Sequence, residues 1–461
     1  MAFSLINETS GATSILALAK ERLSSWLEAA PEYERNWLRA IGFAAEAGKV
    51  ALVPGATGGL ARVLVGLGDG GDATTSIWAL AGLPEALPEG NYRLETAPDG
   101  ADPNQLALGW ALGTYAFARY HTKPATGAAL VWPAGTDRGR VERLARAIFL
   151  ARDLVNTPAG DLGPEELAAA ATRVAESAGA CHRVIVGDEL IAENYPTIHM
   201  VGRASTRAPR LVDIVWGEPS APKVTLVGKG VCFDSGGLDL KPAAGMRLMK
   251  KDMGGAAIML GLAQAITDAR LPVRLRVLLP CVENSVSGDA MRPMDVVRTR
   301  KGLTVEIGNT DAEGRLILCD ALAEAATEQP DLLIDMATLT GAARVALGPE
   351  LPALFCNDDR LADGLLDAAG AEADPIWRMP LWKPYRKLLD SKVADLNNVS
   401  DGPYAGAITA ALYLQEFVAP DIPWAHFDVM AWNPQSRPGR PEGGEATALR
   451  ALYAYLAQSF G

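Results

Sequence analysis

The segment NTDAEGRL, residues 309–316, places Asp311, Glu313 and Arg315 within five positions, directly after a strand-like run. On an extended backbone, residues two positions apart project to the same side, so we expect the two carboxylates to point the same way. Arg315 would continue this series, and Gly314 would leave room for a turn into the following helix. An ordinary surface loop could carry the same residues. The chemistry therefore depends on whether other segments send matching groups to the same place.

Two other segments carry charged residues beside glycines, which permit tight turns and close backbone approach. They are VGKGVCFDSGGLDLKP, with Lys229, Asp234 and Lys241, and MKKDMGG, with Asp252. Each has an ordinary explanation when taken alone: a lysine at a strand end, a polar turn, or a helix cap. Only together do they indicate a site.

Four carboxylates meeting at one site would pose a charge problem. Each pair about 4 Å apart would repel by about 4 kcal/mol at an effective dielectric constant of 20. Two divalent ions would neutralise the four charges, and carboxylate oxygens suit Mg, Mn or Zn. The economical interpretation is a dinuclear metal site formed by Asp234, Asp252, Asp311 and Glu313.

Lys229 can join such a site only as a neutral amine, because an ammonium group has no lone pair. Burial and adjacent divalent cations both favour the neutral form. The chain has four histidines and no H-E-x-x-H motif, so a zinc site built from histidines is not expected. G-x-S-x-G is also absent, which removes the usual signature of a serine hydrolase.

The elements that must position these residues follow an α/β pattern. Residues 1–135 predict a small N-terminal α/β domain, and 136–461 a larger domain that carries all three segments. In the larger domain, apolar strand-like runs alternate with helical segments, which predicts a mostly parallel or mixed sheet flanked by helices. Ligands of such sheets bind beyond the carboxyl ends of the strands.

Composition limits the class of protein. Apolar residues make up 49% of the chain and charged residues 21%, as in globular proteins. The formal net charge of −12 argues against nucleic acid as the main partner. We find neither a signal peptide nor an apolar stretch that could span a bilayer, and the five scattered cysteines suggest reduced thiols. We therefore expect a cytoplasmic protein without a membrane partner.

The three segments closely resemble the signature segments of the leucyl aminopeptidase family, the cytosolic aminopeptidases with two metal ions. ARDLVNTPAG, DMATLTGAA, GAITAALYLQEF and WAHFDVMAWN resemble further family segments and occur in the family's order. The resemblance implies release of N-terminal, apolar, leucine-like residues from short peptides with a free N-terminus, through a metal-bridged water. It also implies a homohexamer of two stacked trimers around an inner cavity.

The resemblance also implies roles for the matching positions. Asp234 and Glu313 would bridge two ions (Mn or Zn, with Mg or Co as alternatives), Lys229 and Asp252 would complete one shell, and Asp311 the other. Lys241 would stabilise the substrate oxyanion, and Arg315 would hold a bicarbonate ion that acts as general base. The implied substrate-binding residues are Met249, Thr338, Leu339 and Gly341.

Some positions depart from the family pattern. Met294 occupies a position where glycine is usual, and Tyr404 one where proline is common. Met249 could be a core residue instead of a pocket residue, and we expect His426 to be a structural residue bonded within the sheet. Two other functions stay open: a non-catalytic hexamer that binds DNA or acts as a scaffold, and a two-metal phosphoesterase.

Overall fold

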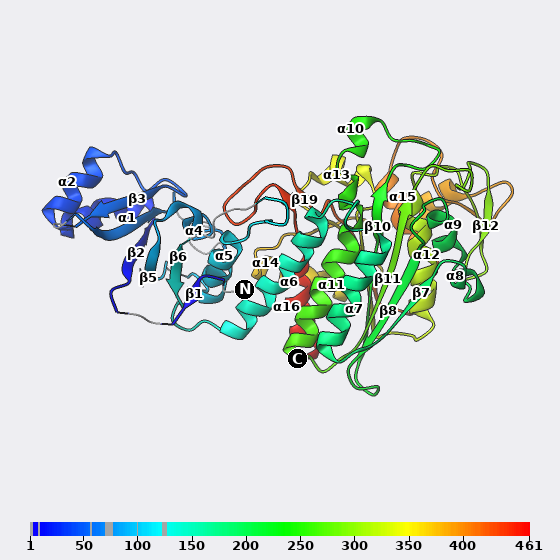
Figure 1. Ribbon diagram of the computed structural model, residues 1–461, viewed down its shortest axis with the longest axis horizontal. Helices are drawn as coiled ribbons and strands as arrows, with labels where there is room; N and C mark the ends of the chain where they lie inside the picture. The colour runs from blue at the N-terminus through cyan, green and yellow to red at the C-terminus, as the bar shows by residue number, and fades with distance from the viewer. Residues whose placement is uncertain (1–2, 8–9, 56–57, 70–76, 99, 122–126) are drawn as a thin grey trace. The chain divides into compact units, whose positions relative to one another are not determined.

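The computed structural model describes residues 3–7, 10–55, 58–69, 77–98, 100–121 and 127–461 (Figure 1). The chain forms two compact units. The first runs to Phe149 and includes Gln435–Glu442, and the second comprises Leu150–Pro434 and Gly443–Gly461. Within the described ranges, no helix combines the length and apolar content needed to cross a membrane.

The first unit contains a six-stranded sheet covered by short helices. Neighbouring strands are parallel except for β3 and β4, which are antiparallel. The strand order is β1 (Leu5–Ile6), β6 (Ala128–Val131), β5 (Gly90–Thr96), β2 (Thr13–Leu18), β4 (Leu60–Gly66) and β3 (Val50–Pro54). The helices are α1 (Lys20–Ala29), α2 (Glu32–Ala40), α4 (Leu83–Ala86) and α5 (Pro103–Gly113). Residues Leu106–Leu112 of α5 are all buried, so this helix lies within the core of the unit.

The second unit is built on a nine-stranded mixed sheet. Its path is β16 (Trp377–Arg378), β15 (Ala353–Cys356), β18 (Trp424–Asp428), β14 (Leu332–Ala337), β9 (Lys223–Gly228), β11 (Arg274–Asn284), β8 (Arg210–Trp216) and β7 (Cys181–Val186). The ninth strand, β10 (Gly230–Asp234), pairs with β11. The central strands β18, β14, β9 and β11 are parallel to one another, whereas β8, β7 and β15 pair antiparallel. This is the mixed α/β arrangement expected from the sequence.

Helices cover both faces of this sheet. In Figure 1, α7 (Pro164–Ala178), α11 (Gly254–Ala269) and α16 (Leu449–Phe460) lie on one side, and α9 (Pro196–Gly202) and α12 (Glu313–Ala326) on the other. The first ten residues of α12, Glu313–Leu322, are all buried, as are twelve of the sixteen residues of α11. Helices that are buried on nearly all sides lie inside a large core, and α12 brings the charged residues Glu313, Arg315 and Asp320 into it. The remaining helices are α6 (Arg138–Asn156), α8 (Glu189–Ala192), α10 (Ala243–Met246), η1 (Met249–Met253), α13 (Gly341–Leu347), α14 (Asp359–Ala371), η2 (Lys383–Leu389) and α15 (Gly406–Gln415).

Two details differ from the sequence prediction. The run LTVEIGN does not join the main sheet, because β13 (Thr304–Glu306) pairs with β12 (Val296–Arg298) and β17 (Leu396–Asn397) in a separate three-stranded sheet. β19 (Trp432–Asn433) and β20 (Gly443–Gly444) form a two-stranded ribbon.

The run KVTLVGKGVCF is divided at Lys229 into β9 and β10, both beside β11. The last residue of β9 is also the last to pair with β14. β9 therefore ends directly before Lys229, the first charged residue of the segment that also carries Asp234 and Lys241.

Candidate metal centre and active site

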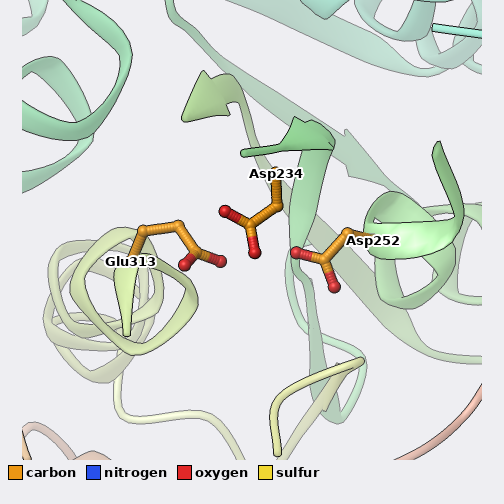
Figure 2. Close-up of side chains that lie close together, drawn as sticks. All are labelled: Asp234, Asp252 and Glu313. Atoms are coloured by element: carbon orange, nitrogen blue, oxygen red, sulfur yellow. The ribbon is translucent and has the colours of Figure 1, made fainter. Parts of the chain in front are cut away.

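Three buried carboxylates converge at the carboxyl ends of the parallel strands. Asp234 ends β10, Asp252 lies in η1, and Glu313 is the first residue of α12. One oxygen of each lies within 4.8 Å of the others, and Figure 2 shows the three groups turned toward a common space. All three residues are at most 3% exposed. The sequence prediction that separate segments send their acids to one place is confirmed for these residues.

Lys229 pairs with two of these carboxylates. Its Nζ is 2.7 Å from Asp252 Oδ2 and 2.9 Å from Glu313 Oε1, and it donates a 3.0 Å hydrogen bond to the Thr338 carbonyl. Burial alone would lower the pKa of this amine, but the carboxylates of Asp252, Glu313 and Asp234 outweigh burial and raise it. The ammonium thus supplies positive charge among the acids, and a neutral amine requires that other cations neutralise them first.

Gly314 has a different role from the one expected. The helix begins at Glu313, so Gly314 is already helical and does not provide a turn before the helix. A Cβ atom at this position would lie 2.6 Å from both Cε and Nζ of Lys229. The absence of a side chain at Gly314 therefore makes the space that the Lys229 side chain occupies.

Lys241 and Asp311 form the outer edge of the cluster. Lys241 Nζ is 2.8 Å from Asp234 Oδ2 and also pairs with Asp311, whose side chain is 32% exposed. Burial would lower the pKa of Lys241, but Asp234 and Asp311 raise it, so this amine keeps its proton. Burial, followed by the charge of Asp234, raises the pKa of Asp311 to about 6.

The geometric argument for Asp311 and Glu313 was wrong, although both residues lie at the site. The strand β13 ends at Glu306, and residues 310 and 311 form a turn before the helix. Their carboxylates approach the cluster from a turn and a helix, not from one face of a strand. Arg315 does not extend the series either, because it lies about 200° around the helix from Glu313.

Two polar residues at the site escaped the sequence analysis. Asn284, the last residue of β11, donates from Nδ2 to Asp234 Oδ1 at 2.9 Å and to the Thr310 carbonyl at 3.1 Å. Thr310 Oγ1 donates to the Gly236 carbonyl at 2.6 Å. Both hold the loops that carry Asp234 and Asp311. The signal for Asn284 was present in the sequence, since the polar pair Glu283 and Asn284 follows the apolar run 277–282 at the same sheet edge.

The electrostatics of the cluster suit metal ions. Burial, and then the negative charge of Asp234, raises the pKa of Glu313 to about 8. Glu313 Oε2 is buried and has no hydrogen-bond partner among the described residues. Buried carboxylate oxygens normally have a partner, so an acceptor facing two other acids fits a cation ligand. The oxygen-rich donor set of Asp234, Asp252 and Glu313 fits a hard divalent metal ion.

Comparison with known proteins decides the family. Residues 149–453 match the cytosol aminopeptidase family, catalytic domain, and residues 14–133 match the M17 aminopeptidase N-terminal domain. The chain belongs to the cytosol aminopeptidase family. A probable cytosol aminopeptidase of Leifsonia xyli subsp. xyli is 40% identical over 459 residues, covering 92% of this chain and 90% of that protein. The resemblance inferred from the signature segments is therefore confirmed, and the chain is a peptidase.

Solved structures of relatives agree over the whole chain. The cytosol aminopeptidase of Coxiella burnetii is 49% identical, with a TM-score of 0.96 and complete coverage of both chains. The bottromycin maturation enzyme BotP in complex with Mn is 36% identical, with a TM-score of 0.89, covering 98% of this chain and all of that chain. Both units of the chain thus share the fold of the cytosol aminopeptidase family.

The remaining candidate residues of this family member lie around the cluster. Thr338 Oγ1 donates to Asp252 Oδ1 at 2.8 Å, and the Leu339 N–H donates to Asp428 Oδ1 at 3.0 Å. Gly341 is exposed at the start of α13, and Met249 is buried at the start of η1. Thr338 therefore contacts Asp252 directly, Met249 shares η1 with Asp252, and Leu339 and Gly341 follow Thr338 in the same turn.

Arg315 is buried between α12 and α15. Its Nη1 donates to the Asn398 carbonyl at 2.6 Å, and its guanidinium lies 6.0 Å from the centre of the Tyr413 ring. Its Nε has no hydrogen-bond partner among the described residues, and burial lowers its pKa. Arg315 is thus a buried cation whose Nε–H group makes no hydrogen bond to a described residue.

The departures from the family pattern have structural correlates. Met294 has φ = 71°, in the left-handed region where glycine carries no steric penalty, so the backbone at this position favours glycine. Met294 and Tyr404 are 76% and 83% exposed. His426 is fully buried, and its Nδ1 lies 2.6 Å from Asp335 Oδ1 on the adjacent strand. It is a residue of the sheet interior, as expected.

Proposed function

We propose that this member of the cytosol aminopeptidase family is a metal-dependent aminopeptidase that releases N-terminal apolar residues, such as leucine, from short peptides. The observation that carries the proposal is the buried group of Asp234, Asp252 and Glu313, with one carboxylate oxygen lacking a partner among the described residues. Two lysines from the same sheet edge pair with these acids.

In this proposal, two divalent ions would be held by residues already at the site. Asp234 and Glu313 would bridge them, Lys229 and Asp252 would complete one shell, and Asp311 would complete the other. When bound, such ions polarise a carbonyl group and lower the pKa of water. Carboxylate and amine ligands accept Mn, Zn, Mg and Co, so metal analysis of the isolated protein must identify the native ion.

Lys241 is the proposed electrostatic catalyst. Its raised pKa keeps a positive charge at the site, and its side chain is 15% exposed, so it is accessible to a substrate. We propose that this ammonium donates to the carbonyl oxygen of the scissile bond as negative charge develops there. A fixed donor of this kind is worth about 10²–10³ in rate.

Arg315 and the 338–341 turn complete the proposal. Arg315 would hold a bicarbonate ion that accepts a proton, a proposal supported by its burial and by an Nε that makes no hydrogen bond to a described residue. Backbone groups of Leu339 and Gly341 would hold the peptide, with Thr338 behind them and Met249 facing the first side chain. The flexible, apolar side chain of methionine suits an apolar substrate residue.

The test is to compare leucyl dipeptides that carry a free or an N-acetylated amine, with added Mn or Zn. We expect hydrolysis of the free peptides alone, because acetylation removes the amine lone pair that the site would coordinate. A phosphate ester assayed in parallel tests the phosphoesterase interpretation. Equal rates on blocked and free peptides would refute the proposed function.

A further inference from the structure

Asp428 forms a compact set of contacts with the turn that follows β14. It is the last residue of β18, is 3% exposed, and pairs with Ala337 at the end of β14. Its Oδ1 accepts hydrogen bonds from the backbone N–H groups of Leu339 at 3.0 Å and Thr340 at 3.2 Å. Its Oδ2 accepts from Thr340 Oγ1 at 2.6 Å. One side chain therefore fixes two consecutive peptide units.

The same turn contacts the carboxylate cluster on its other side. The Thr338 carbonyl accepts from Lys229 Nζ at 3.0 Å, and Thr338 Oγ1 donates to both the carbonyl and Oδ1 of Asp252. Thr340 Oγ1 also accepts from the Ala343 N–H at 3.0 Å, which caps α13. Residues 338–340 thus connect β18, η1 and α13, and Asp428 anchors them to the sheet.

The turn keeps polar backbone groups available. Leu339 and Thr340 are partly exposed and Gly341 is exposed, although the neighbouring residues of β14 are buried. In the described part of the chain, no hydrogen bond uses the Leu339 carbonyl or the Gly341 N–H. Asp428 already accepts from the Leu339 N–H. The Leu339 carbonyl and the Gly341 N–H therefore remain for a ligand, and the anchored turn fixes their directions.

We propose that Asp428 is a positioning residue for the substrate: it holds residues 338–341 in the conformation that binds the backbone of the peptide. Asp428 touches neither the substrate nor the carboxylates, and it acts through the turn. This inference rests on the proposed aminopeptidase function. It predicts that loss of Asp428 weakens peptide binding more than it slows the chemical step, because Lys229 keeps its contacts with Asp252 and Glu313.

A matched control is available in the same unit. Asp374 is 5% exposed and also accepts hydrogen bonds from three backbone N–H groups, those of Ala448, Arg450 and Ala451. These groups belong to α16 and the residue before it, not to the turn. Asp374→Ala therefore removes a comparable buried carboxylate without loosening residues 338–341.

The experiment measures KM and kcat on a leucyl dipeptide for the wild type, Asp428→Ala, Asp428→Asn and Asp374→Ala. We expect Asp428→Ala to raise KM about tenfold and to change kcat less than about threefold, since misplacing a binding group by about 1 Å costs up to 10²-fold overall. Asp428→Asn keeps an oxygen for the two N–H groups but loses the acceptor of the Thr340 hydroxyl, so we expect a smaller rise in KM. Asp374→Ala should leave KM unchanged.

Hydrogen–deuterium exchange supplies a readout that needs no activity. Faster exchange of Leu339 and Thr340 is expected in Asp428→Ala, a smaller increase in Asp428→Asn, and no change in Asp374→Ala. A wild-type KM in Asp428→Ala and Asp428→Asn, or an equal rise in the Asp374 control, would overturn the inference. If Asp428→Ala does not fold, the Asn variant decides. A wild type that cleaves no peptide would refute the proposed function, while the exchange data would still test the anchoring of the turn.

Discussion

Substitution of Gly314 by alanine should separate catalysis from folding. The new methyl group would lie 2.6 Å from Cε and Nζ of Lys229 and 2.9 Å from its Cδ. Carbon atoms in contact are about 3.5–4.0 Å apart, so the lysine must move by about 1 Å. The end of a lysine side chain usually yields easily. Here it does not, because Nζ is held by Asp252, Glu313 and the Thr338 carbonyl.

The magnitude follows from two opposing terms. Overpacking of a buried site costs about 1–3 kcal/mol, whereas replacing a helical glycine by alanine contributes about 0.5–1 kcal/mol of stability. The free energy of unfolding should therefore fall by about 2.5 kcal/mol or less. A shift of about 1 Å in a group at the site can lower activity by about 10²-fold. We expect kcat/KM to fall by about this factor in a protein that remains folded.

The assay compares dipeptide hydrolysis and thermal unfolding of the wild type, Gly314→Ala and Gly370→Ala. Gly370 lies near the end of α14, and a Cβ atom there would contact nothing within 4 Å. Gly370→Ala should keep full activity and unfold at an equal or slightly higher temperature. Full activity in Gly314→Ala would show that the position of Lys229 does not matter, and would refute the reasoning.

Three further outcomes are expected. In chelator-treated protein, burial raises the pKa of Glu313 to about 8, so between pH 4.5 and about 8 the folded chain holds a proton that the unfolded chain has released, and stability should fall as the pH rises through this range. Thermal unfolding should show a weaker pH dependence in Glu313→Gln, which should also lose peptidase activity; an unchanged dependence would contradict the assignment. Arg315→Ala should reduce activity less than Glu313→Gln and be partly rescued by added bicarbonate, and a lack of rescue would argue against an anion held there. Light scattering should report about six times 48.6 kDa, and an active monomer would refute the hexamer.

The positions of the charged residues could be predicted because they follow a rule of parallel sheets. Acids that end apolar runs next to glycines should meet at one sheet edge, and Asp234, Asp252 and Glu313 do so. The sequence did not show which backbone conformation places each acidic side chain at the site. Asp311 and Glu313 have the spacing of residues on one face of a strand, but Asp311 lies in a turn and Glu313 begins a helix. Both conformations place two acids at one site, so the outcome was predictable although the geometry was not.

Contacts between distant segments could not be predicted from the sequence either, because the partners lie far apart along the chain. The run 304–306 has the composition of a strand in the main sheet, but its pairing with β12 and β17 depends on residues up to about 90 positions away. Asn284 reaches Asp234 across 50 positions, and Asp428 reaches Leu339 across 89. Local patterns show which residues suit a strand end, whereas the choice of partner depends on the packed sheet.

The cost of the carboxylate cluster explains why so much of the core surrounds it. Burial raises the pKa of Glu313 to about 8, so keeping this residue ionised near neutral pH destabilises the folded chain unless cations are present. The helices that carry or follow the acids, α11 and α12, are among the most completely buried elements of the second unit. Their apolar packing offsets the repulsion and leaves the acids little freedom to move apart. The packing therefore holds the mutually repelling carboxylates together. A pair of divalent ions bound between them would relieve this repulsion.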